Sequence, residues 1–226
     1  MFTRTIELIG NEAFLRLQQT RVILFGTGGV GGWCAEALLR TGITHLTLVD
    51  YDTVAVSNLN RQVVATQATI GQSKVEAMRD RLLSINPDAD LVAVAQRYGG
   101  DDGWKPDWHQ YDIAVDAIDM ITYKAQLLYE ATAAGLAVFS AMGAARKTDC
   151  EQVQTAEFLK VYGCPLGRAV RHRMKHTGLF PQQPVYCVFS PEQPHKDERI
   201  KGSIAPVVGV FGMQLAGLVI RHILRS

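Results

Sequence analysis

Residues 22–62 read VILFGTGGVGGWCAEALLRTGITHLTLVDYDTVAVSNLNRQ, and this stretch decides the fold. It starts with an apolar run typical of a buried parallel strand. Gly26, Gly28 and Gly31 then form a G-x-G-x-x-G turn before a segment whose apolar residues have helical spacing, and the next apolar run ends in Asp50. Such glycines let the backbone approach a phosphate, and an acid at this place accepts hydrogen bonds from ribose hydroxyls. The stretch therefore predicts a nucleotide-binding unit.

Strands and helices alternate along most of the chain, which is typical of a doubly wound α/β sheet. We expect strands at 21–26, 45–50, 90–96, 111–119 and 136–143, and helices at 11–20, 29–42, 70–87 and 122–135. Later segments predict strands at 150–158 and 185–190, a helix at 159–175, a loop at 175–184, a polar exposed stretch at 191–202 and an apolar helix at 204–220. No linker interrupts this order. The sequence predicts one domain over 1–226, a Rossmann-like, mostly parallel sheet with antiparallel C-terminal strands and a C-terminal helix.

The bulk composition is that of an ordinary globular protein. The chain has 226 residues, 47% of them hydrophobic and 20% charged, with a net charge of +1, so charge alone names no partner. The N-terminus has no leader pattern. Residues 204–220 carry no charge, but a proline and three glycines favour a buried helix over a membrane span. We expect a cytoplasmic protein without membrane association.

The four cysteines form no Cys-x-x-Cys pair, so the usual spacing of a structural zinc site is absent and we expect no zinc. Cys164 and Cys187 leave thiol chemistry open as an alternative. Because Cys187 lies inside an apolar run, a buried, unreactive side chain is favoured there.

Polar residues after the second strand distinguish this site from that of a dehydrogenase. Ser57, Asn58, Asn60 and Arg61 follow that strand, and Lys74 opens the next helix. A nicotinamide site needs apolar room at this place. Two cations converging on polyphosphate suit a triphosphate with its metal and the charge that develops in phosphoryl or nucleotidyl transfer.

Two acids end a later strand on the same rim of the sheet. Asp116 and Asp119 lie at its carboxyl end, where a carboxylate can hold Mg²⁺. For Asp119 the alternative is an N-cap of the following helix, and both roles could coexist.

Four segments together carry a family resemblance: GTGGVGG, LVDYDTVAVSNLNRQ, IGQSKVEAM and DAID. They resemble the E1-like adenylating superfamily of ThiF, MoeB and HesA type, over most of the chain. Within it, IELIG, RTGI, INP, CPL and CVFSPE most resemble the branch that dehydrates N6-threonylcarbamoyladenosine (t6A) in tRNA.

The resemblance implies a nucleotide site made of these residues: Gly26, Gly28, Gly29, Gly31, Asp50, Asp52, Ser57, Asn58, Asn60, Arg61, Lys74, Asp116 and Asp119. It implies catalytic roles for Arg61 and Lys74 at the phosphates and for Asp119 at the metal and the α-phosphate. Arg4 matches an arginine that such enzymes lend across a homodimer to the partner's ATP; the alternative is an ordinary surface arginine.

The reaction implied is attack of a substrate carboxylate on ATP with Mg²⁺, giving an acyl adenylate that then cyclises. A bound monovalent cation, Na⁺ or K⁺, and a cysteine desulfurase partner of CsdA–CsdE type belong to the same resemblance. One alternative is an adenylyltransferase acting on the Gly-Gly tail of a ubiquitin-like sulfur carrier, against which the missing zinc cysteines argue. Another is a redox or non-enzymatic Rossmann protein, against which the two cations argue.

A basic segment lies between Glu157 and Glu192, where no acid occurs. Its cations are Lys160, Arg168, Arg171, Arg173 and Lys175, with His172 and His176 beside them. Phosphate contacts from such a segment predict salt-dependent binding of t6A-modified tRNA, with a solvated helix face as the alternative.

Overall fold

The computed structural model describes residues 1–100, 103–193 and 202–225. Its centre is a seven-stranded sheet in the order β3-β2-β1-β4-β5-β7-β6. The strands are β1 Arg21–Phe25, β2 His45–Val49, β3 Asp90–Val94, β4 Ile113–Asp116, β5 Ala137–Ala141, β6 Gln154–Glu157 and β7 Tyr186–Phe189. Only β6 and β7 pair antiparallel among these strands. The predicted doubly wound sheet with antiparallel C-terminal strands is confirmed.

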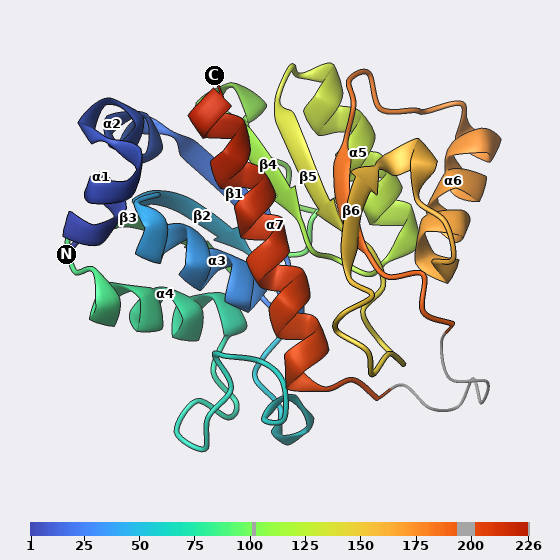
Figure 1. The fold of residues 1–226 in the computed structure, drawn as a ribbon. Helices are drawn as coiled ribbons and strands as arrows, with labels where there is room; N and C mark the ends of the chain where they lie inside the picture. Colours follow the sequence, from blue (N-terminus) through green and yellow to red (C-terminus); the bar gives the residue numbers. More distant parts are fainter. Residues whose placement is uncertain (101–102, 194–201, 226) are drawn as a thin grey trace.

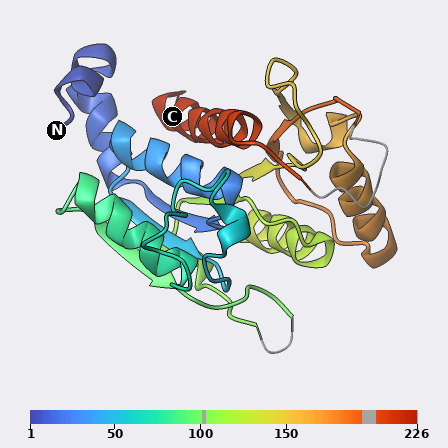
Figure 2. The ribbon, with the colours of Figure 1, turned by 90° about the horizontal axis from the view of Figure 1, so that it is seen from below.

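Helices cover both faces of the sheet (Figures 1 and 2). They are α1 Thr3–Ile9, α2 Asn11–Gln19, α3 Gly29–Thr41, α4 Lys74–Ile85, α5 Ile121–Ala133, α6 Pro165–Thr177 and α7 Ala205–Arg225. Short 3₁₀ turns lie at Val56–Asn58, Trp108–Gln110 and Phe158–Lys160. α2, α3, α4 and α7 pack on one face, whereas α5 and α6 pack on the other.

The buried strand β1 shows how the sequence builds two cores. Val22 and Leu24 belong to the apolar cluster on the α3 face, and Ile23 and Phe25 belong to the cluster on the α5 face. All four are fully buried. Because successive side chains of a strand point to opposite faces, a continuous apolar run serves a sheet covered on both sides.

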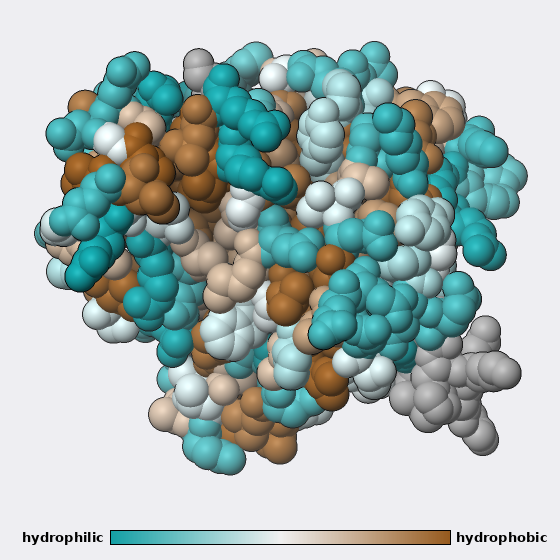
Figure 3. Space-filling model, in the orientation of Figure 1, coloured by the Kyte–Doolittle hydropathy of each residue, from teal (hydrophilic) through white to brown (hydrophobic). Residues whose placement is uncertain are grey.

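The apolar C-terminal helix α7 packs against α3, β5 and β7. By length and composition it is the one helix of the described residues that could cross a membrane, but half of its most apolar stretch is buried within the molecule. A side chain at Gly212 would lie 2.6 Å from the carbonyl oxygen of Val30, so the two helices cross closely. The face shown in Figure 3 mixes polar with apolar side chains. The prediction of a buried helix packed on the sheet is confirmed.

Several boundaries differ from the sequence prediction. α4 begins at Lys74 rather than at residue 70, because the backbone just before it pairs with Val54: Gly71 donates to the carbonyl of Val54, and Val54 donates to that of Gln72. α6 begins at Pro165 rather than 159, and α1 was not predicted. Residues 194–201, within the stretch expected to be polar and exposed, lie outside the described residues.

Candidate active site

A cavity of about 630 Å³ lies where the strand order reverses, between β1 and β4. Its walls come from the carboxyl ends of β1, β2 and β4, from the starts of α3 and α4, and from two later segments, 141–146 and 203–208. Crevices at such a switch point are the usual ligand sites of open parallel sheets. The size suits a nucleotide, because pockets for small molecules span roughly 300–1,000 Å³.

The glycine turn forms the floor of this cavity. Gly26 adopts φ +87°, a left-handed conformation, and its N–H donates to the carbonyl of Val49 at 2.8 Å. A Cβ on Gly31 would lie 1.7 Å from the carbonyl oxygen of Gly26, so α3 can approach the turn only with glycine there. At Gly28 the nearest atom to such a Cβ is 3.8 Å away. The space above Gly28 therefore suits a phosphate approaching the N-terminus of α3, which begins at Gly29.

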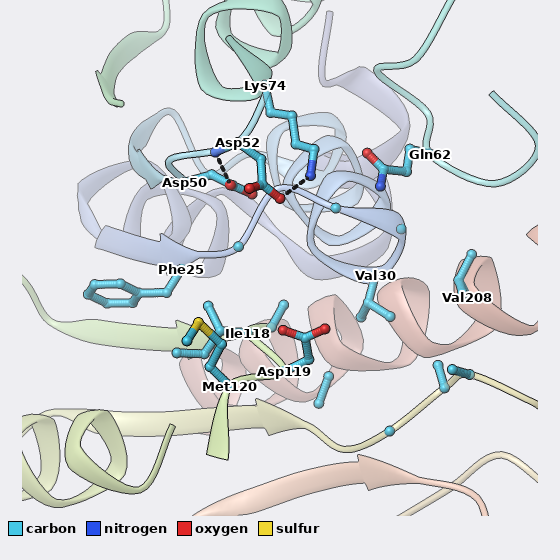
Figure 4. A pocket seen from close by; sticks show the side chains of 18 of the residues that line it. Phe25, Val30, Asp50, Asp52, Gln62, Lys74, Ile118, Asp119, Met120 and Val208 are labelled. Carbon is cyan, nitrogen blue, oxygen red and sulfur yellow. Dashed lines mark hydrogen bonds and ion pairs between the residues drawn. The ribbon is translucent and has the colours of Figure 1, made fainter. Parts of the chain in front are cut away.

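The carboxylate of Asp50 is held at the end of β2. Its Oδ2 accepts hydrogen bonds from the backbone N–H of Thr27 at 2.7 Å and from the Thr27 hydroxyl at 3.2 Å. Its Oδ1 accepts from the backbone N–H of Asp52 at 3.0 Å. The bonds from Thr27 join the acid to the glycine turn, and Figure 4 shows the bond between Asp50 and the backbone of Asp52.

Two cations reach the cavity from separate elements. Lys74, the first residue of α4, is 8% exposed, and its Nζ lies 2.7 Å from Asp52 Oδ2 (Figure 4). The guanidinium of Arg61 donates to the carbonyl of Ser57 at 2.7 Å and to the side chain of Asn60 at 2.9 Å. Both cations line the cavity and are held there by neighbouring groups, which favours a site that neutralises phosphate charge.

Asp119 points into the cavity from the loop after β4 (Figure 4). It does not cap α5: the N-cap residue is Met120 and makes no side-chain cap, so that alternative is wrong. Within the described residues, no three His, Cys, Asp or Glu side chains gather to hold a metal ion. A single carboxylate facing a phosphate site still fits Mg²⁺, which keeps waters and takes phosphate oxygens as its other ligands.

The remaining predicted residues divide into two groups. Asn58 lines the cavity, and its side chain accepts from the N–H of Ala55 at 3.0 Å. Ser57 and Asn60 adjoin the cavity without lining it, and the Asn60 amide donates to the carbonyl of Ser203 at 2.8 Å. Arg4 is exposed on α1, away from the cavity of its own chain.

Asp116 differs from its prediction. It is fully buried beneath the cavity wall, and its carboxylate contacts Lys124 and Ser140 at 2.6 Å each. Asp116 does not line the cavity, so its carboxylate does not reach a nucleotide bound there in this conformation.

Sequence reasoning missed the wall formed by Gln96, Arg97 and Tyr98 and by Tyr51. Burial, followed by the nearby carboxylates Asp52, Asp119 and Asp50, raises the pKa of Tyr51. Gln96–Tyr98 follow β3 at the same edge as Asp50, so the strand-end rule that found the acids would have found this segment too.

The predicted basic residues lie mostly on the outer face of α6. Arg168, Arg173 and Lys175 are exposed, and so is Lys160 just before the helix. Arg171 instead donates to the carbonyl of Phe158 at 3.2 Å and stacks over its ring, so it braces the helix. A surface hollow of about 490 Å³ is lined by Pro165, Arg168, Ala169, His172, Arg173 and His176.

The two cysteines with a proposed thiol role are buried. Cys187 is 0% and Cys164 is 2% exposed. Burial raises the pKa of the Cys187 thiol well above its usual range. Since the thiolate is the reactive form, this favours an inert Cys187.

The sequence matches the ThiF family over residues 2–226. It is 36% identical over 193 residues to the tRNA threonylcarbamoyladenosine dehydratase of Bacillus subtilis (strain 168), covering 85% of this chain and 75% of that protein. The molybdopterin-synthase adenylyltransferase of Escherichia coli (strain K12) is 31% identical over 221 residues, covering 92% and 74%.

Solved structures of related proteins agree with these sequence matches. The E. coli tRNA N6-threonylcarbamoyladenosine dehydratase TcdA in complex with ATP superimposes with a TM-score of 0.89 at 30% identity, covering 99% of this chain and 93% of that one. The E. coli MccB structure with ATP has a TM-score of 0.61 at 19% identity and shows the fold alone.

Proposed function

The chain belongs to the ThiF family, and on that premise we propose that it catalyses the ATP-dependent dehydration of t6A in tRNA to a cyclic form. The observation that carries the proposal is one cavity that gathers Asp50, Arg61, Lys74 and Asp119 in a fold matching an ATP-bound dehydratase over 99% of the chain. The relatives from Bacillus subtilis and Escherichia coli that are named as t6A dehydratases are 36% and 34% identical over 85% and 84% of this chain.

The proposed reaction has two steps. A carboxylate oxygen of the threonyl group attacks the α-phosphorus of ATP, the bond to the bridging oxygen breaks, and pyrophosphate leaves. A nucleophile in the same threonylcarbamoyl group then attacks the acyl carbon, AMP leaves with the former carboxylate oxygen, and a ring closes. The nucleoside loses the elements of one water, which end up in the products of ATP.

The chain's own residues supply position and charge. Asp50 accepts hydrogen bonds from the ribose and fixes the nucleoside against the glycine turn. Lys74 and Arg61 neutralise the phosphates as negative charge moves to the leaving group. Asp119 would be the side chain that holds Mg²⁺, and the ion would supply further positive charge at the triphosphate. In-line placement of the carboxylate and the α-phosphorus supplies the remaining acceleration.

The second candidate, activation of a protein tail, has weaker support. The molybdopterin-synthase adenylyltransferase is 31% identical, against 36% for the B. subtilis dehydratase. The basic face of α6 also suits a polyanion better than a glycine tail that carries a single terminal carboxylate.

Nucleoside mass spectrometry decides between the two. The protein is incubated with ATP, Mg²⁺ and t6A-containing tRNA, with Lys74→Ala as the matched inactive control. Loss of one water that depends on ATP and on Lys74 supports the dehydratase. Unchanged t6A, together with pyrophosphate release upon addition of a carrier protein ending in Gly-Gly, would replace it with the second candidate.

The outer face of α6 supports the proposal that tRNA docks beside the cavity. Leu166 in its first turn lines the cavity, and Arg168 and Arg173 follow on the exposed face. Because the helix rises about 1.5 Å per residue, these cations lie within about 10 Å of Leu166 along the axis. Phosphates flanking a nucleoside in the cavity can therefore reach them.

Charge reversal tests this docking surface. Arg168→Glu with Arg173→Glu should weaken tRNA binding and reduce the slope of log affinity against log salt by about 2. Arg221→Glu with Arg225→Glu, two exposed positions about 20 and 25 Å from Val208 along α7, is the control with the same change in net charge. Equal weakening by the control would refute the docking surface.

In the proposed homodimer, Arg4 enters the cavity of the partner subunit, which agrees with its position away from the cavity of its own chain. Mixing Arg4→Ala with Lys74→Ala tests this, because a mixed dimer holds one site with both residues. Recovery of about a quarter of wild-type activity supports the shared site, and no recovery refutes it. Cytoplasmic location, a bound Na⁺ or K⁺ and a CsdA–CsdE type partner stay predictions.

A further inference from the structure

A buried ion pair lies beneath the cavity wall and has no role in the reaction described so far. Lys124 Nζ lies 2.6 Å from Asp116 Oδ2, and both side chains are 0% exposed. The hydroxyl of Ser140 donates to the same carboxylate at 2.6 Å. Burial of two charges is costly and is offset only by good geometry and further hydrogen bonds. Packing alone therefore does not explain why these two charges are buried together.

The two side chains of the pair bond to both backbone polar groups of Ile118. Asp116 Oδ1 accepts from the N–H of Ile118 at 3.2 Å. Lys124 Nζ donates to the carbonyl oxygen of Ile118 at 2.9 Å. Just before it, the N–H of Ala117 donates to the carbonyl of Phe25 at 2.8 Å. The loop between β4 and α5 is thus tied to the buried pair and to β1.

This loop carries two residues into the cavity. Ile118 and Asp119 both point into it (Figure 4). In the described part of the chain, no hydrogen bond holds the Asp119 carboxylate itself. Its place is therefore set by the backbone to which it is attached, and that backbone is fixed by the pair.

We propose that Lys124 and Asp116 act as positioning residues, holding the Ile118 backbone so that Asp119 stands where the metal-bound triphosphate needs it. The inference rests on the proposed function, since it gives Asp119 that role. Neither residue of the pair touches the ligand. An uncharged, non-donating side chain at position 124 would leave the buried carbonyl of Ile118 without a donor.

The double variant Lys124→Met with Asp116→Asn is the informative change. Lys124→Met alone would leave a buried carboxylate without its cation and would strongly destabilise the fold. In the double variant the Asn amide oxygen can still accept from Ile118 N–H, and the Asn NH₂ group can donate to the Ser140 hydroxyl in place of the bond that Ser140 now donates. Only the charge and the donor to the Ile118 carbonyl are lost.

Glu36→Gln is the matched control. Glu36 is also buried and accepts hydrogen bonds from two arginines, Arg81 at 2.6 Å and Arg40 at 2.8 Å. It lies on α3 and faces α4, away from the loop, so its loss lowers stability without moving Asp119. A general loss of stability should look alike in both variants.

Binding of ATP is measured by calorimetry with and without Mg²⁺, alongside hydrogen exchange of the 113–121 segment. We expect ATP affinity without Mg²⁺ to stay within about twofold, and the gain in affinity from Mg²⁺ to fall about tenfold. Exchange of the Ile118 amide should speed up in the double variant alone. Turnover of t6A should fall about 100-fold, whereas the KM for ATP in the presence of Mg²⁺ should rise by no more than about tenfold.

A wild-type response to Mg²⁺ and unchanged exchange in the double variant would overturn the inference, whatever its melting temperature. An inactive wild-type protein would overturn the proposed function instead. In that case the binding and exchange measurements still decide whether the pair positions the loop.

Discussion

Gly31→Ala should break the nucleotide site by forcing the glycine turn apart. The new Cβ would lie 1.7 Å from the carbonyl oxygen of Gly26 and 3.2 Å from the Cβ of Ala117, whereas real contacts of this kind stay beyond 3.0 Å. The turn or α3 must move by more than 1 Å, and both belong to the buried core.

The expected cost is about 3 kcal/mol, the upper part of the range for overpacking a core. For a domain of this size that corresponds to a fall in melting temperature of roughly 6–12 °C. ATP at about 100 times its Kd stabilises the wild type by about 2.7 kcal/mol, and this shift should vanish in the variant because the phosphate floor is distorted.

Gly28→Ala separates the two effects in the same thermal-shift assay. Its Cβ meets no atom closer than 3.8 Å, so the melting temperature without ATP should stay close to that of the wild type. The methyl group would occupy the space above the turn, so the ATP-induced shift should still shrink. If Gly31→Ala had the wild-type melting temperature and the wild-type ATP-induced shift, the predicted clash between position 31 and the carbonyl of Gly26 would be refuted.

Three further outcomes follow from burial and contact. Gly212→Ala in α7, whose Cβ would lie 2.6 Å from the Val30 carbonyl oxygen, should lower the free energy of unfolding by about 1–3 kcal/mol. Gly209→Ala, with open space around it, should raise the free energy of unfolding by up to about 1 kcal/mol. Urea denaturation measures both changes, and a change of the same sign in both variants would contradict the packing of α7 on α3. Burial alone would raise the pKa of Glu36, but hydrogen bonds from Arg81 and then Arg40 outweigh it and lower the pKa. Its stabilisation is therefore present above the unfolded pKa of about 4.3 and is lost as pH falls through the lower folded value, so Glu36→Gln should be less stable at pH 7 and converge with the wild type in acid. Thiol labelling of the native protein should modify Cys150 first and leave Cys187 untouched until unfolding, because only Cys150 is partly exposed; early labelling of Cys187 would reopen thiol chemistry.

The sequence predicted what depends on neighbours along the chain. Gly26, Gly31 and Asp50 stand in fixed order within one strand–turn–helix–strand unit, so their spacing alone was informative. The cavity they form could be inferred because parallel strands end at one edge of the sheet.

The rest depends on partners distant in sequence. The burial of Asp116 is set by Lys124 on α5 and Ser140 on β5, and nothing in the DAID pattern distinguishes a buried acid from one in the cavity. The late start of α4 depends on pairing of residues 71–72 with Val54. The wall at 141–146 was not predicted because it depends on how β5 leaves the sheet.

The packing of α7 on α3 has a consequence for how the protein is made. The glycine turn and α3 leave the ribosome early, but the wall formed by Ser203 and Val208 is translated much later. At roughly 5–20 residues per second, the apolar side of α3 stays uncovered for about ten seconds or more. A nascent or truncated chain can therefore form the turn without a finished nucleotide cavity, and during that interval its uncovered apolar surface favours aggregation.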